Sequence, residues 1–308
     1  MAPRNFKKLA LLTKIEATYA ADATPLAANA MQVSNVTFTP LEAQEVSRDL
    51  MLPYLGNQGV VLAEMMARMQ FSVEVAGSGT LGTAAAFGPL LRSCGLAEVI
   101  TANTSVIYSP ISGSFESSTS YWNHDGVNHV LLGCRGNVQL DFSPSKIPYL
   151  KFDLMGLLGT VSDIALPAAS YAAFKKPVVV NKANTTATLF GNACIAESVS
   201  IDLGQKAEGR FLIGDESIQI TDRSSTGTAV IQAGSVASFD VISAARNRTR
   251  GAFQLTHGTA AGNICTVAAP QVELGKISQG QTQNILNYSI PLMFCPANGN
   301  DELSIAFT

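Results

Sequence analysis

The chain has 308 residues, of which 47% are hydrophobic and only 14% are charged. Charged residues make up about 25% of a typical soluble domain, so this surface suits burial against neighbouring molecules. The net charge of −3 argues against tight nucleic-acid binding, because phosphate contacts need a basic surface. No apolar run reaches the ~18 to 20 residues that span a bilayer. Five scattered cysteines favour reduced thiols in a cytoplasm over a disulfide framework.

The N-terminal segment, residues 4–19, is predicted to form a helix or an arm. Its basic residues precede an apolar stretch that is too short for the core of a signal peptide, so we expect no secretion signal. Most of the remaining sequence alternates apolar and polar residues. Strict alternation predicts half-buried antiparallel strands. These strands are expected at 33–38, 69–75, 138–142 and 150–154.

Helical signals are few. Residues 83–95 predict a short helix with Pro89 in its first turns and a glycine stop. Asp125-Gly126 lies between two strand-like runs and tolerates the positive φ angles of a two-residue turn, so we expect a hairpin there. Strand and helix do not alternate repeatedly, which argues against a parallel α/β sheet.

The second half of the chain repeats the pattern of the first. In each half a strand, a charged irregular stretch, a second strand, an alanine-rich helix, a hairpin and two closing strands follow in the same order. The charged stretches are 41–68 and 204–225, and the helices are 85–95 and 237–247. This order indicates a duplicated β domain. We therefore expect a first domain over 1–170, including the N-terminal arm, and a second over 171–308.

No motif in the sequence supports catalysis. Residues 77–82 fit the G-x-G-x-x-G spacing of a dinucleotide site, but no βαβ unit surrounds them, and we favour a flexible loop that caps a helix. His124, Asp125 and His129 resemble metal ligands. On the hairpin His124 and His129 would lie diagonally on one face, but no third ligand close to these two histidines is evident, which favours a solvated turn. His257 stands alone. We therefore expect no enzyme activity, no cofactor and no metal.

The polar face of the predicted sheet is the most distinctive remaining feature. If one strand face builds the core, the opposite face carries five carboxylates against one lysine and is mildly acidic. Its candidate members are Glu74, Gln139, Asp141, Lys151, Asp153, Asp202 and Glu273.

Several long runs of the sequence resemble one known family. These runs include "VSNVTFTPLEAQEVSRDLMLPYLGNQG", "FSVEVAGSGTLGTAAAFGPLLRSCGLAE", "SFESSTSYWNHDGVNHVLLGCRGNV", "ITDRSSTGTAVIQ" and the C-terminal "GNDELSIAFT". They are similar to the major tail protein, or tail tube protein, of long-tailed, non-contractile, siphovirus-type bacteriophages. The resemblance extends over nearly the whole chain, from Leu12 to Thr308.

The resemblance implies a mainly β fold with two tandem tail-tube-like domains. Each domain would be an antiparallel β-sandwich or partial barrel with one short helix and a long loop between early strands. Six such domains close into a ring, so two fused domains imply a ring of three chains with pseudo-sixfold symmetry. A second half that is only an outer decoration would instead require six chains. Rings stack head to tail into a tube that conducts DNA during ejection.

The resemblance also implies partners and a location. The partners are other copies of the chain, a tape-measure protein, and the tail tip and tail terminator proteins. DNA passes through the lumen without sequence-specific binding, and no membrane is involved. The protein is expected in the virion tail, after assembly in the bacterial host cytoplasm.

Two sets of residues follow from this interpretation. The polar-face residues named above become candidates for the lining of the lumen, where negative charge would repel phosphates. The charged stretches become candidates for contact between rings or subunits. Their candidate residues are Arg48, Asp49, Tyr54, Leu55, Met65, Arg68, Arg210, Asp215, Asp222 and Arg223.

One alternative from another class stays open. A monomeric β-sandwich that binds carbohydrate or a cell surface, such as a fibre or adhesin module, would need an exposed aromatic platform. Trp122 is the only tryptophan in the chain.

Overall fold

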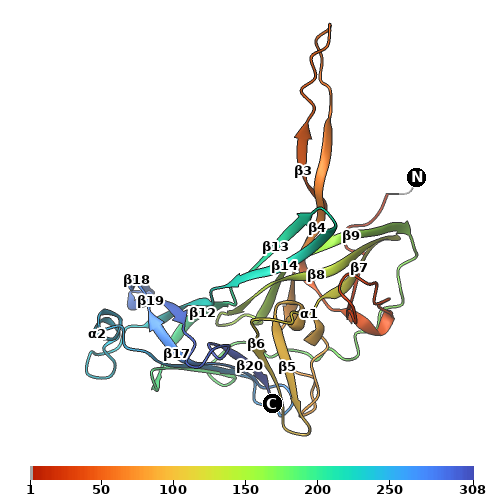
Figure 1. Ribbon diagram of the computed structural model, residues 1–308. Coiled ribbons are helices and arrows are strands. Elements are labelled where there is room, and N and C mark those ends of the chain that lie inside the picture. Colours follow the sequence, from red (N-terminus) through yellow and green to blue (C-terminus); the bar gives the residue numbers. More distant parts are fainter. Residues whose placement is uncertain (1–2) are drawn as a thin grey trace.

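A computed structural model describes residues 3–308 and shows a mainly β protein (Figure 1). Residues 1 and 2 of the predicted first domain lie outside the described part. Two short α-helices, α1 (Gly88–Ser93) and α2 (Val241–Arg246), and a 3-10 turn at Ala27–Asn29 accompany the strands. Pro89 occupies the first turn of α1, as predicted, because that position needs no backbone donor.

A long antiparallel sheet, which we call the inner sheet, runs through both halves of the chain. Its neighbours are hydrogen-bonded in the order β3–β4–β9–β8–β12–β15–β19–β18. The strands are β3 (Ser34–Ser47), β4 (Val60–Glu74), β9 (Tyr149–Asp163), β8 (Val127–Phe142), β12 (Ala196–Asp202), β15 (Thr226–Gln232), β19 (Ile285–Phe294) and β18 (Ser278–Thr282). The pairing of β8 with β12, from Val199↔Phe142 to Asp202↔Gln139, joins the two halves.

A second run of strands, the outer sheet, has the order β5–β6–β20–β17–β16–β10–β11. The strands are β5 (Leu96–Thr101), β6 (Ser105–Pro110), β20 (Ser304–Phe307), β17 (Cys265–Leu274), β16 (Gly251–His257), β10 (Thr185–Leu189) and β11 (Asn192–Ala193). Here the C-terminal strand β20 pairs with β6, which ties the end of the chain to its first half. The strands β2 (Ala30–Met31), β1 (Leu9–Ile15) and β7 (Ser118–His124) extend from β8.

The pairing order of the first half recurs in the second half, where the fourth strand of the run is β17, a strand of the outer sheet that also pairs with the end of β19. In the first half the order is β3–β4–β9–β8, and in the second it is β12–β15–β19–β17. In both runs the first two strands precede the short helix in sequence, and the last two follow it.

The alternation in the sequence places the core between the two sheets. Val73, Leu150 and Leu140 are fully buried, whereas their strand neighbours Glu74, Lys151 and Gln139 are at least partly accessible. Successive strand residues point to opposite faces, so one face of each strand joins the core and the other stays polar. The buried side chains form one cluster that includes residues of both halves.

Three sequence-based expectations were wrong. Residues 4–19 contain the strand β1, which pairs with β7 over seven residues, so tertiary pairing overrides the helical interpretation. The stretch 41–68 is irregular only over residues 48–59, because its two flanks continue β3 and β4 as a long hairpin. The stretch 204–225 is likewise a hairpin of β13 (Gln205–Leu212) and β14 (Asp215–Arg223). These strands could not be recognised from alternation of apolar and polar residues, because neither face of the two hairpins is fully buried and both carry charged side chains.

Candidate functional site

The polar face of the inner sheet brings together residues of β4, β8, β9 and β12. The Lys151 Nζ lies 2.7 Å from Asp141 Oδ2. Asp202 accepts hydrogen bonds from the side-chain amides of Asn137 at 2.6 Å and Gln139 at 2.8 Å. Four of the predicted residues therefore form a connected polar surface around a shallow depression, which is lined by Gln139, Asp141, Lys151 and Asp202.

Two arginines that sequence reasoning did not assign to this face neutralise part of it. Arg68 in β4 donates to both carboxylate oxygens of Asp153, and this hydrogen bonding raises the pKa of Arg68. The Arg250 Nε lies 3.4 Å from Glu273 Oε2. The sequence does contain a signal for Arg68. It precedes the core-facing Met69 in a strand, so alternation directs the Arg68 side chain to the polar face. Arg250 had no such signal, because it lies just outside a strand.

The inner sheet is open at both ends within the described chain. β3 pairs with β4 alone, and β18 pairs with β19 alone. Unpaired strand edges expose rows of backbone N–H and C=O groups, which favour pairing with another chain. A single chain of residues 3–308 therefore leaves two edges available for assembly.

A long hairpin, which we call the arm (residues 41–65), projects from the inner sheet (Figure 1). The β3–β4 pairing continues to Ser47↔Val60, beyond the point where β9 stops supporting β4 at Met66↔Leu157. The tip exposes large apolar side chains, including Met51 and Leu55, which are both 103% exposed. Of the predicted contact residues, Arg48, Asp49, Tyr54, Leu55 and Met65 lie on the arm, and Arg68 lies on the polar face.

The other predicted contact residues lie on the β13–β14 hairpin. Arg210, Asp215 and Asp222 are exposed there. Arg223 is instead held within the chain. Its guanidinium pairs with Glu302 at 2.5 Å and donates to the carbonyl of Ile111 at 2.6 Å, which leaves 13% of the side chain exposed. This arginine fastens β14 to the C-terminal region.

The glycine-rich loop 77–82 has a structural explanation. Gly79 N–H donates to the carbonyl of Gly262 at 3.0 Å, so the loop packs on a loop of the second half. A Cβ atom on Gly77 would lie 2.0 Å from the same oxygen. The glycines therefore permit two backbones to touch.

The hairpin residues and Trp122, the other candidates from the sequence, make structural contacts within the chain. Asp125 and Gly126 form the predicted turn, with φ angles of 48° and 96°. Asp125 accepts from the N–H of Asn5 and lies 3.4 Å from Lys8 Nζ, so it holds the N-terminal segment. No group of three metal-ligating side chains occurs among residues 3–308. Trp122 is 1% exposed and stacks on Phe38, so it offers no binding platform.

The helices described in residues 3–308 include none that is both long and apolar enough to cross a membrane. The profile of a protein family described as "phage tail tube protein" matches residues 7–294, which is most of the chain. A comparison with curated proteins finds no match.

Proposed function

We propose, on the premise that the chain belongs to the phage tail tube protein family, that it polymerises into stacked rings forming a conduit for DNA. Membership of the family makes it a structural component of the phage tail. The observation that carries the finer proposal is the inner sheet, which spans both halves and is unpaired at each end in residues 3–308. Pairing β3 of one chain with β18 of the next would close the sheet into a ring.

The number of strands supports a ring of three chains. Each chain contributes β3, β4, β9, β8, β12, β15, β19 and β18 to the inner sheet. Three chains would then supply about 24 strands, and at ~4.8 Å spacing and ~40° tilt the backbone diameter is roughly 50 Å. Side chains of ~5 Å on each side leave a bore of about 40 Å, which admits a DNA duplex.

The repeated pairing order supports tandem domains. Because β3–β4–β9–β8 and β12–β15–β19–β17 have the same order, each half would supply one of six equivalent positions in the ring. We place the domain boundary near residue 170, in the strand-free segment between β9 and β10. This arrangement corresponds to the ring of three chains with pseudo-sixfold symmetry that the sequence resemblance implies.

The polar face would line the bore. Glu74, Asp141, Asp153, Asp202 and Glu273 oppose Arg68, Lys151 and Arg250 there, which leaves a mildly acidic surface. Such a surface repels phosphates, and DNA slides along it without sequence-specific contacts.

The arm and the β13–β14 hairpin would contact the adjacent ring. A head-to-tail contact does not close on itself, so it extends rings into a tube. The tube would assemble in the host cytoplasm around a tape-measure protein and end at tail tip and tail terminator proteins.

Electron microscopy of the purified chain tests this function. We expect rings or tubes in a series of protein and salt concentrations, with class averages that show three chains and six similar lobes in each ring. Discrete monomers under every condition would contradict self-assembly. Six chains in each ring would contradict the tandem-domain arrangement alone.

A further inference from the structure

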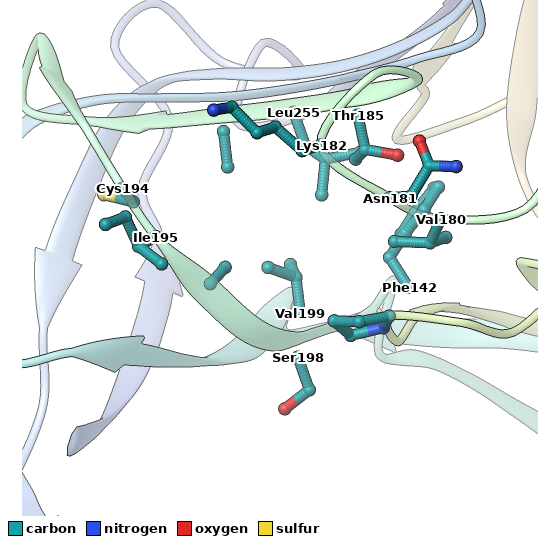
Figure 2. Close-up of a pocket in the computed structure, with 13 residues that line it drawn as sticks. Phe142, Val180, Asn181, Lys182, Thr185, Cys194, Ile195, Ser198, Val199 and Leu255 are labelled. Atoms are coloured by element: carbon teal, nitrogen blue, oxygen red, sulfur yellow. The ribbon is translucent and has the colours of Figure 1, made fainter. Parts of the chain in front are cut away.

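An apolar cavity opens at the junction of the two halves. It has a volume of about 390 Å³ and lies between the end of β8, the strand-free segment before β10, and the strands β10, β12 and β16. In Figure 2, Cys194 and Ile195 stand at one end of the open space, and Phe142 and Val180 stand at the other. Ile195 is 69% exposed at the rim. The cavity could receive aliphatic side chains from another molecule.

The cavity and the arm lie at opposite ends of the inner sheet. β4 pairs with β9 from Met66↔Leu157 to Glu74↔Tyr149, and β9 pairs with β8 as far as Asp141↔Tyr149. Phe142 and the cavity are therefore at the Glu74 end, whereas the arm continues past Val60 at the other end. This is the placement that a head-to-tail contact between two copies requires.

The two ends carry complementary charge. The arm contains Glu42, Glu45, Asp49 and Glu64 but only one basic residue, Arg48, so its net charge is −3. The segments that border the cavity, 142–148 and 164–199, contain four lysines and one carboxylate, Glu197, which accepts hydrogen bonds from Thr282 and Asn287.

The lysines of these bordering segments are exposed and free. Lys182 lines the cavity, and the carbonyl of Lys146 accepts from the N–H of Val180 in the cavity wall. Lys176 lies four residues before Val180 in the same segment. Within residues 3–308, neither these three lysines nor the four arm carboxylates form an ion pair.

From these observations we propose that the cavity receives the arm tip of a second copy of this chain in the adjacent ring. Met51 or Leu55 would enter the apolar space, and the arm carboxylates would face Lys146, Lys176 and Lys182. Apolar burial would supply affinity, and charge would select the register between rings. The inference rests on the proposed function and adds to it a defined receiving site.

Chemical cross-linking of wild-type tubes provides the first test. A carbodiimide joins a carboxylate to a lysine amine as an amide, with loss of water, and requires direct contact. Tubes assembled from mixed ¹⁴N- and ¹⁵N-labelled protein are treated, digested and analysed by mass spectrometry. We expect mixed-isotope links from Glu45, Asp49 or Glu64 to Lys146, Lys176 or Lys182. Tubes whose arm carboxylates link only to other lysines, or to none, would overturn the inference.

A cysteine pair provides the second test. Leu55→Cys and Ile195→Cys are combined in a chain whose half-buried Cys194 and Cys295 are changed to serine, since the other three cysteines are buried. Oxidation of tubes should give a ladder of covalent multimers on a non-reducing gel. The matched control pairs Leu55→Cys with Val99→Cys, an exposed position on the outer sheet, and should give at most dimers. Equal products from both pairs would contradict the site.

The two proposals fail in different ways. Wild-type protein that forms no tubes at all would remove the proposed function together with this inference. Wild-type tubes without the predicted links would remove the receiving site alone. If the cysteine variants do not assemble, the cross-link map of the wild-type tubes decides whether the cavity receives the arm tip.

Discussion

The guanidinium of Arg68 in β4 and the carboxylate of Asp153 in β9 form a two-point hydrogen bond, with Nε 2.7 Å from Oδ1. The Gln70 amide donates to the same carboxylate at 3.0 Å. A bidentate pair fixes both side chains on the sheet surface and cancels a negative charge there. The carboxylates of the polar face are therefore of two kinds. Asp153 and Glu273 are paired with arginines, whereas Glu74 forms no ion pair within residues 3–308.

Reversing charge on this face should slow DNA release without preventing assembly. Glu74→Lys removes a negative charge and adds a positive one, and Asp141→Lys places two lysines side by side at 141 and 151. Because every ring of a tube carries the substitution, we expect release from particles to slow several-fold, and more at low salt. Release kinetics are measured in particles shown to contain the variant. Asp141→Asn is the matched control, because it removes the negative charge without adding a positive one, and it should slow release less. Identical release kinetics for all three variants and wild type would exclude this face from the lumen.

Shortening the arm should separate ring formation from stacking. Ser47 and Val60 are paired across the hairpin, so a two-residue Asn-Gly turn can replace residues 48–59. We expect the melting temperature of the unassembled protein to stay within a few degrees, because the removed side chains lie outside the core. Electron microscopy should show rings but no stacked tubes. Tubes of ordinary length would show that the arm is dispensable.

Adding a methyl group to the glycine-rich loop should destabilise the contact between the halves. In Gly77→Ala the new Cβ would overlap the carbonyl of Gly262, and the backbone of one loop has to move. We expect a loss of about 1 to 3 kcal/mol in the free energy of unfolding, measured with denaturant. The control is Gly113→Ala, since nothing lies within 4 Å of that position and its φ is not in the left-handed range. An equal effect at both sites would contradict the close approach.

Removing Arg223 should be far more costly than removing an exposed ion-pair partner. Arg223→Ala leaves the Glu302 carboxylate with 7% exposure and no cation, which should cost about 3 kcal/mol. The matched variant Lys206→Ala breaks a pair whose side chains are 62% and 48% exposed, and should change the free energy of unfolding far less, because solvent screens an exposed ion pair. Chemical denaturation of both variants measures the difference. Similar losses would show that Arg223 does not fasten β14 to the C-terminal region.

Stability should decrease on the alkaline side. Burial raises the pKa of the Cys134 and Cys265 thiols from 9.0 to about 12. The folded protein therefore keeps both thiols protonated, while the unfolded chain ionises them above about pH 9. Their contribution is fully present below about pH 9 and is lost as the pH rises towards 12, so the free energy of unfolding decreases over this range.

Denaturant unfolding at pH 8 and pH 11 checks the alkaline effect. Cys265→Ala should show a smaller decrease between the two pH values than wild type, because it has lost one of the buried thiols whose pKa is raised, which also include Cys94 and Cys134. A wild-type free energy of unfolding that is equal at both pH values would contradict the expected linkage.

Local sequence patterns alone determined a large part of this molecule. Alternation identified β4, β8 and β9 and the polar face that carries Asp141, Lys151 and Asp153, because successive strand residues point to opposite sides. Asp125-Gly126 fixed the β7–β8 turn, because its backbone tolerates positive φ.

Tertiary structure decided the features that depend on partners distant in sequence. The strand at Leu9–Ile15 exists because β7 pairs with it, and the charged arm is a hairpin because its two strands pair with each other. The continuous inner sheet depends on the hydrogen bonds between β8 and β12, and no local pattern encodes that choice of neighbour. The apolar cavity at Ile195 forms only where these distant segments meet. The sequence thus determined which faces are apolar, and long-range pairing determined which edges and cavities remain open.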